Sequence, residues 1–398
     1  MSEKTNGYRW VVLIIACFAL FSPSYAQYQL PPLAPQIIAD LGLTPSQFTG
    51  IFSAPMIPAI FLSLVAGLLA DKFGIKLTIG IGLVISAVGA FLRIGSGTYQ
   101  FLFFSMLVTG FGTAFLNTNG PKIIGSWFPP DKVGGMMGIF LAASTLAMTA
   151  GMGTTAMLPG LRTAYIIAAV LTILGAVLWL LLMKKPPETE TAQGAAQTIP
   201  ISACLKVVLK SRTVWFVGIC LMGIMASVVI ISSFLPTILG GRGIDPVAAG
   251  IYGSAVTIGN LLGCIFAPVL AGRLGLNKPF LYLFTIISVV GAAFGWQAPQ
   301  GALLAICLCI TGIAMGGLMP LLMSIPVQLP EIGPLYAGTA GGVACTLQLI
   351  GAVVIPTYIA GPIAGANMNM FFIVGGACMI MVFLFTLGLP ELGKKRKV

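Results

Sequence analysis

The chain has 398 residues, of which 58% are hydrophobic and 7% are charged, and its net charge is +11. Soluble domains carry roughly 25% charged residues, so this composition excludes a soluble globular protein and indicates one that crosses a membrane repeatedly. The sequence has no His and no Cys pair at a metal-ligand spacing. We therefore expect no metal site and no other cofactor.

Apolar runs long enough to cross a bilayer recur from one end of the chain to the other. The run after Arg9 continues past the length of a signal-peptide core and lacks a small-residue cleavage site, so we expect it to be the first transmembrane helix. Twelve spans are predicted, near residues 10–38, 47–70, 77–96, 99–124, 133–158, 162–183, 213–239, 247–271, 279–297, 301–323, 336–362 and 368–389.

A long polar stretch separates the first six predicted spans from the last six. It begins at Lys184-Lys185 and is rich in Thr, Ala, Gln and Pro before it becomes basic near Arg212. We therefore predict an N-terminal six-helix bundle, a cytoplasmic linker, a C-terminal six-helix bundle and a basic cytoplasmic tail, over residues 1–183, 184–212, 213–390 and 391–398.

The distribution of Lys and Arg orients these spans. With an even number of spans both termini lie on one side, and placing them in the cytoplasm leaves Arg93, Arg162 and Arg242 outside, out of 20 Lys and Arg. We expect Arg93 and Arg162 to face water at the membrane boundary. The basic C-terminal run is expected to contact anionic lipid rather than nucleic acid. The predicted location is the plasma or inner membrane.

The two halves repeat each other at a spacing of about 200 residues, half of the chain. The matching segments begin at the end of the first predicted span of each half and continue into the second. They are Pro35-Gln36-Ile37-Ile38 with Pro236-Thr237-Ile238-Leu239, Gly42-Leu43-Thr44-Pro45 with Gly243-Ile244-Asp245-Pro246, and Gly50-Ile51-Phe52-Ser53-Ala54 with Gly250-Ile251-Tyr252-Gly253-Ser254. The repeat indicates a parallel duplication of a six-helix unit.

A short charged segment, Gly67-Leu68-Leu69-Ala70-Asp71-Lys72-Phe73-Gly74-Ile75-Lys76, joins the second and third predicted spans. It resembles the loop signature of the major facilitator superfamily, with Ile75 where a basic residue is usual. Glycine at the first position allows a close helix approach, glycine near the end suits a turn, and an Asp is favoured beside a helix N-terminus. The resemblance implies a gating role for Gly67, Asp71, Lys72, Gly74 and Lys76.

The resemblance also implies a fold and a site. The fold is an all-α integral membrane protein with twelve transmembrane helices in two pseudo-symmetric six-helix bundles, which hold the substrate near mid-membrane and rock around it. Polar groups at membrane depth usually face such a cavity, although Ser, Asn and Gln also join helices by hydrogen bonds. The candidate substrate-binding residues are Ser24, Tyr25, Gln27, Tyr28, Asn117, Asn119, Lys122, Asn260 and Gln348.

Charge within the spans bears on the substrate and on coupling. Every Asp and Glu falls in a loop, a tail or a helix end, so a carboxylate proton relay is not supported, although Asp40 or Glu331 could titrate at a helix end. If Lys122 points into the cavity, a cation there would favour an anionic substrate; the alternative is that Lys122 is an anchor facing water.

We therefore predict a secondary transporter, not an enzyme, that moves a small organic or inorganic anion by uniport, exchange or symport. Export of amphipathic drug-like compounds is the alternative. A receptor or a membrane enzyme would need a soluble sensing domain or a buried catalytic cluster, and the sequence shows neither. The expected partners are a small-molecule substrate and the lipid bilayer, without nucleic acid, and the chain is expected to act as a monomer.

Overall fold

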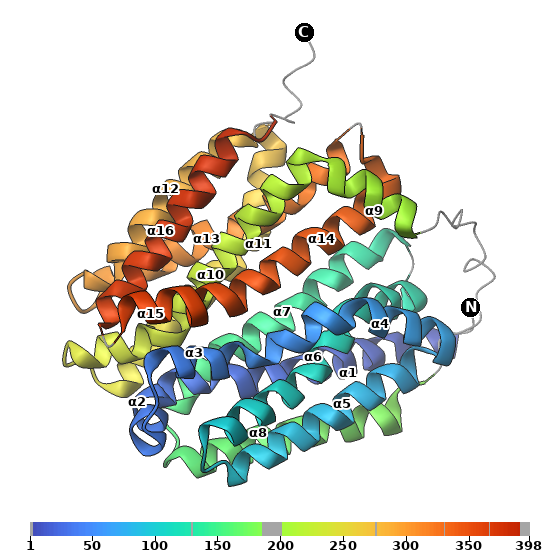
Figure 1. The fold of residues 1–398 in the computed structure, drawn as a ribbon. Helices are drawn as coiled ribbons and strands as arrows, with labels where there is room; N and C mark the ends of the chain where they lie inside the picture. The colour runs from blue at the N-terminus through green and yellow to red at the C-terminus, as the bar shows by residue number, and fades with distance from the viewer. Residues whose placement is uncertain are drawn as a thin grey trace. The chain divides into compact units, whose positions relative to one another are not determined.

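The computed structural model describes residues 3–128, 130–184, 201–274, 277–329, 331–365 and 367–390. Within these ranges the chain is helical and contains no strand (Figure 1). The chain divides into two compact units, each with most of its contacts within itself. Unit 1 comprises Met1–Leu43 and Gly50–Gly194, and unit 2 comprises Thr44–Thr49 and Ala195–Val398. The all-α fold expected from the sequence is confirmed.

Unit 1 is built around α1, which packs against α6, α7 and α8, while α5 lies between α6 and α8. Buried apolar side chains from all five helices meet in one core, which includes Leu20, Leu83, Leu116, Phe140 and Trp179. The elements of this unit are α1 (Glu3–Tyr28), α2 (Leu30–Leu41), α3 (Pro45–Ser53), η1 (Ala54–Met56), α4 (Ile57–Phe73), α5 (Ile75–Leu92), η2 (Arg93–Gly95), α6 (Tyr99–Trp127), α7 (Pro130–Thr155) and α8 (Leu161–Leu182).

Unit 2 pairs α10 with α14 and α16, and α11 with α13. Thr44–Thr49 at the start of α3 also belongs to it, because Ser46 Oγ donates to the Thr357 carbonyl (2.5 Å) and the rings of Phe48 and Phe234 are 6.0 Å apart. The elements are α9 (Ile201–Lys210), α10 (Arg212–Gly241), α11 (Pro246–Leu274), α12 (Lys278–Phe294), η4 (Gly295–Gln297), α13 (Ala302–Gln328), α14 (Gly333–Val354), the π-helix η5 (Ile355–Ala360), α15 (Gly361–Ala364) and α16 (Met368–Leu387).

Eleven helices in the described part of the chain are long and apolar enough to cross a membrane. The predicted span 47–70 is the exception, because a 3-10 turn at η1 divides it into α3 and α4. Pro55 lies in this turn, and a proline has no N–H to donate to a continuous helix. The second span of the prediction is therefore a broken helix.

The sequence repeat corresponds to repeated local structure. Gly42 ends α2 with φ +60°, and Gly243 follows α10 with φ +81°, so both glycines adopt a left-handed conformation that other residues rarely take. Pro45 and Pro246 then begin α3 and α11, and proline is favoured at a first helical position. Each half of the sequence therefore makes the same turn between its first and second predicted spans.

Candidate functional site

The polar residues of α1 lie just before the helix ends at Tyr28. Pro31 and Pro32 follow, and because prolines lack N–H groups they cannot donate to the carbonyls of Gln27 and Tyr28. A turn at Gln29 separates α1 from α2. This break places the polar side chains where two helix ends meet inside unit 1.

Each candidate of α1 has a partner inside unit 1. Gln27 Nε2 donates to the Phe52 carbonyl (2.9 Å), and the ring of Tyr28 packs edge-on against the ring of Phe52. The hydroxyls of Tyr25 and Thr154 share a hydrogen bond of 3.1 Å, and Ser24 Oγ donates to the Leu20 carbonyl (2.9 Å). All four candidates are buried. Gln27 and Tyr28 hold α1 to α3 and Tyr25 holds it to α7, whereas the bond of Ser24 stays within α1. A role of these residues in substrate binding stays a prediction.

The candidates on α6 differ in exposure. Asn117 is exposed and Lys122 is half-buried, whereas Asn119 is fully buried. Asn119 Nδ2 donates to the carbonyls of Phe115 (3.0 Å) and Ala66 (3.3 Å), while its Oδ1 accepts no hydrogen bond within the described residues. The Asn119 Oδ1 atom could therefore still accept a hydrogen bond.

In unit 2 the candidates Asn260 and Gln348 are half-buried, on α11 and α14. Asn260 lies where α11 crosses α13: its carbonyl faces Gly316, and its Oδ1 is 3.9 Å from Cys264 Sγ. Its backbone thus takes part in a close helix crossing. No hydrogen bond joins Asn260 to Gln348 in the part of the chain that the structure describes, and their substrate role also stays a prediction.

The gating segment is shorter than expected. Helix α4 continues through Lys72 to Phe73 and α5 begins at Ile75, so Gly74 alone connects them, with φ +86°. The turn expected at Gly74 is confirmed. Lys72 is exposed, and the Lys76 carbonyl accepts from Trp179 Nε1 (3.0 Å). The surroundings of Gly67 and the side chain of Asp71 lie outside what the structure describes.

Arg93 is the functional candidate that sequence reasoning missed. It was expected at the membrane boundary facing water, and this expectation is wrong: Arg93 is 0% exposed. Its Nη1 donates to the Ala26 carbonyl (2.6 Å), its Nη2 donates to Gln29 Oε1 (2.7 Å), and its Cζ lies 4.3 Å from the ring centre of Tyr165. The signal in the sequence that could have found it was Pro31-Pro32, which lies just after the end of α1, where the Ala26 carbonyl and the Gln29 side chain accept hydrogen bonds from Arg93.

Arg162 and Arg242 behave differently, since both are exposed. Arg242 donates to the carbonyls of Trp296 and Ala298 at the end of η4. The contrast is informative because a buried cation in a membrane protein is costly unless something compensates its charge. Arg93 is therefore the basic residue whose burial requires a functional or structural explanation.

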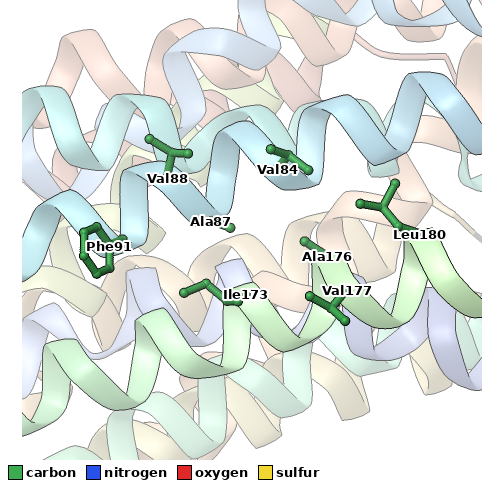
Figure 2. A pocket seen from close by; sticks show the side chains of 8 residues that line it. All are labelled: Val84, Ala87, Val88, Phe91, Ile173, Ala176, Val177 and Leu180. Carbon is green, nitrogen blue, oxygen red and sulfur yellow. The ribbon is translucent and has the colours of Figure 1, made fainter.

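The hollows found in unit 1 and unit 2 are apolar. One, of about 310 Å³, lies between α5 and α8, and Figure 2 shows that only hydrocarbon side chains line it, among them Val84, Phe91 and Leu180. Another, of about 470 Å³, lies between α12 and α13 and includes Ile286, Phe294 and Thr311. Neither contains a charged residue. Among the described residues no three His, Cys, Asp or Glu side chains gather to hold a metal.

Comparison with known proteins gives a family match. The family model described as Major Facilitator Superfamily matches residues 10–356. The uncharacterized transporter YycB of Bacillus subtilis is 24% identical and covers 88% of this chain and 85% of its own length. The probable nitrate/nitrite antiporter NarK1 of Thermus thermophilus (23%; 90% and 86%) and the sialic acid transporter NanX of Escherichia coli (25%; 89% and 88%) also match over most of both chains.

Solved structures show the same fold at low sequence identity. A bacterial homologue of the human lysosomal transporter Spinster, in an inward-facing and unoccupied conformation, superposes with a TM-score of 0.78 at 15% identity. That match covers 97% of this chain and 96% of the other. The nucleoside transporter NupG superposes with a TM-score of 0.76 at 17% identity, covering 94% and 99%. These likenesses support the arrangement of helices and carry no information on substrate.

Proposed function

Because this chain belongs to the major facilitator superfamily and is therefore a multi-pass membrane transporter of small solutes, we propose that its substrate is a small organic or inorganic anion. Transport proceeds by alternating access, in which the two bundles expose the substrate in turn to either side of the membrane. Uniport, exchange and symport are all compatible with this proposal.

One observation carries the choice of an anion. The eleven described spans contain no Asp or Glu, and their charged residues are all basic. Intramembrane charges are costly and usually mark the path of an ion or a substrate, with a partner of opposite sign. Here a substrate anion would supply that partner. The basic residues in these spans are Arg9, Lys76, Arg93, Arg162, Arg212 and Lys278. All six lie within three residues of a span end, and Arg93 is the one that is fully buried.

The relatives support this choice by their names. The hexuronate transporter of Bacillus subtilis is 27% identical over 195 residues, and others are named for nitrate/nitrite and sialic acid. All of these solutes are anions at neutral pH. A riboflavin transporter of Clostridioides difficile, 30% identical over 131 residues, is a relative that favours the alternative, export of amphipathic drug-like compounds.

The proposal includes an arrangement in the cell. The chain lies in the plasma or inner membrane as a monomer with both termini in the cytoplasm, and residues 184–212 link the two bundles on that side. The candidate substrate residues of α1, α6, α11 and α14 line the path, and Lys122 on α6 attracts the anion. The segment from Gly67 to Lys76 controls the balance of inward and outward states.

Flux through proteoliposomes tests the proposal. Purified protein is reconstituted, and uptake and efflux are measured for nitrate, formate, hexuronate and sialic acid, with riboflavin and a neutral sugar for comparison. We expect saturable flux of at least one anion that exceeds flux in empty liposomes. Flux of riboflavin without flux of any anion would instead establish the alternative.

A further inference from the structure

We propose that Arg93, Gln29 and Tyr165 form a binding site for a small anion inside unit 1. The three side chains come from η2, from the turn between α1 and α2, and from α8. They are 0%, 0% and 2% exposed, and Arg93 contacts both of the others. They thus form one buried polar cluster, which we call the Arg93 cluster.

The Arg93 cluster has more donors than acceptors. Arg93 Nε, Gln29 Nε2 and the Tyr165 hydroxyl are buried polar atoms without a hydrogen-bond partner in the described residues. Leaving a buried donor unpaired destabilises the folded protein, and more so when the group is charged. An anion can accept hydrogen bonds from all three kinds of donor, whereas a cation can accept none.

The orientation of the Gln29 amide follows from Arg93. A guanidinium can only donate, so the amide must turn its oxygen, Oε1, toward Nη2 at 2.7 Å. The amide nitrogen Nε2 is therefore left as a donor without an acceptor. Rotating the amide by half a turn would place two donors against each other, so the excess of donors does not depend on how the amide was assigned.

The positive charge of the Arg93 cluster also favours an anionic ligand. No carboxylate pairs with Arg93 among the residues that the structure describes, and its other contacts are the Ala26 carbonyl, Met106 Sδ (3.6 Å) and the face of Tyr165. Asp40 on α2 influences Tyr165 electrostatically but is exposed and makes no bond to the cluster. Carbonyl, sulfur and ring contacts orient a guanidinium without neutralising it, and a small anion would do so.

The proposal that the site binds an anion rests on the proposed function for the class of ligand. Binding to the site is measured separately from transport. Arg93 then holds an anion in unit 1 in addition to Lys122, the residue that attracts the transported anion in the proposed function. Entry requires the cluster to open, because all three side chains are buried in this structure.

Thermal unfolding of the full-length protein in detergent tests the site. The melting temperature is measured as sodium gluconate is replaced by sodium nitrate, formate or chloride at constant ionic strength. We expect at least one small anion to raise it saturably. Tyr165→Phe keeps the ring under Arg93 but loses a donor to the anion, which is worth about 1.5–3 kcal/mol, so we expect about 10-fold to 100-fold weaker binding.

Two further variants separate binding from a structural role. Gln29→Glu places a carboxylate beside Arg93, so we expect a folded protein whose melting temperature no longer responds to the anion. Tyr282→Phe removes a hydroxyl from α12 in unit 2 and should respond as the wild type does. Equal melting temperatures in gluconate and in all three small anions would overturn the proposal, as would wild-type responses in Tyr165→Phe and Gln29→Glu.

The outcome is distinguishable from that of the flux experiment. Saturable stabilisation that the cluster variants abolish, without anion flux, would leave the site in place and refute the proposed function. Anion flux with an unchanged Michaelis constant in Tyr165→Phe and Gln29→Glu would leave the function in place and refute the site.

Discussion

At the scale of single residues, the hydrogen-bond partners of a buried polar side chain show whether its burial needs a functional explanation. Gln27 and Asn119 are buried and donate to carbonyls of other helices in unit 1, so part of their role is to join helices, whereas buried Ser24 donates within α1. Neutral side chains with such partners are inexpensive inside a membrane protein. A charged residue is a different case, since burial costs more and only an opposite charge compensates it fully. Lys122 and Arg93 are therefore the residues to change first.

For Lys122, we expect Lys122→Ala to abolish anion flux and Lys122→Arg to retain part of it, because arginine keeps the charge on a longer side chain. Initial rates of uptake into proteoliposomes measure this. Lys278→Ala serves as the control, since Lys278 lies at the start of α12 and donates to the Leu387 carbonyl (3.3 Å). Full flux in Lys122→Ala would rule this lysine out as the anion's partner.

At the scale of elements, glycine decides how closely two helices approach. In unit 2, α11 and α13 cross so closely that a Cβ on Gly312 would strike the Val256 carbonyl and one on Gly316 would strike the Asn260 carbonyl. Gly259 and Gly263 face α13 in the same way, with a spacing of four residues on each helix. Such small-residue spacing allows backbone contact in membranes, where apolar burial alone does not drive helices together.

A substitution in this crossing should be destabilising. Gly312→Ala adds one methyl group against backbone that cannot rotate away, and overpacking of this kind costs about 1–3 kcal/mol. We expect a lower melting temperature in detergent. Gly341→Ala on α14 is the matched control, because nothing lies within 4 Å of the added Cβ. There, alanine should leave stability unchanged or raise it slightly. Equal melting temperatures for the two variants would show that α11 and α13 can separate freely.

The joint between α4 and α5 is the element that we expect to set the balance of conformations. Asp71→Asn removes the negative charge of the segment from Gly67 to Lys76, which resembles the loop signature of the family. We expect this change to shift the ratio of inward and outward states without abolishing folding. Labelling of single introduced cysteines from either side of the membrane measures the ratio. If labelling and flux both match the wild type, Asp71 has no gating role.

At the scale of the whole molecule, the distribution of charge bears on energetic coupling. A proton-coupled transporter needs an ionisable group that is exposed alternately to the two sides, and such groups are usually buried acids or His. The chain has no His, and its described spans contain no Asp or Glu. A carboxylate at a helix end, such as Asp40 or Glu331, is the remaining candidate. Glu331 Oε1 already accepts a hydrogen bond from Ser211 Oγ at 2.6 Å.

We therefore expect anion flux to be insensitive to an imposed pH gradient. Uptake into proteoliposomes with an interior at pH 6 or pH 8 and an exterior at pH 7 measures this, with a proton ionophore as the control. The same flux in both directions of the gradient would support uniport or exchange. A flux that follows the gradient would contradict the expectation, and Asp40→Asn and Glu331→Gln would then identify the titrating carboxylate.

The sequence by itself determined the class, the family and most of the spans of this protein. Hydrophobic length is a local property, so eleven of the predicted spans coincide with helices that can cross a membrane. The repeat predicted the shared turns at Gly42 and Gly243, since a left-handed conformation strongly favours glycine. The broken second span is the exception, because Pro55 lies inside an otherwise continuous apolar run.

Only the tertiary structure decided which polar residues meet. Arg93 contacts groups that are 64 and 67 residues away in the sequence, at Gln29 and Ala26, and no local pattern predicts such pairings. The same holds for Gln27 with Phe52 and for the glycines of α11 and α13, whose neighbours come from another helix. Burial of a charge depends on which helices surround it, so the sequence could place Arg93 along its helix but could not show that it is buried.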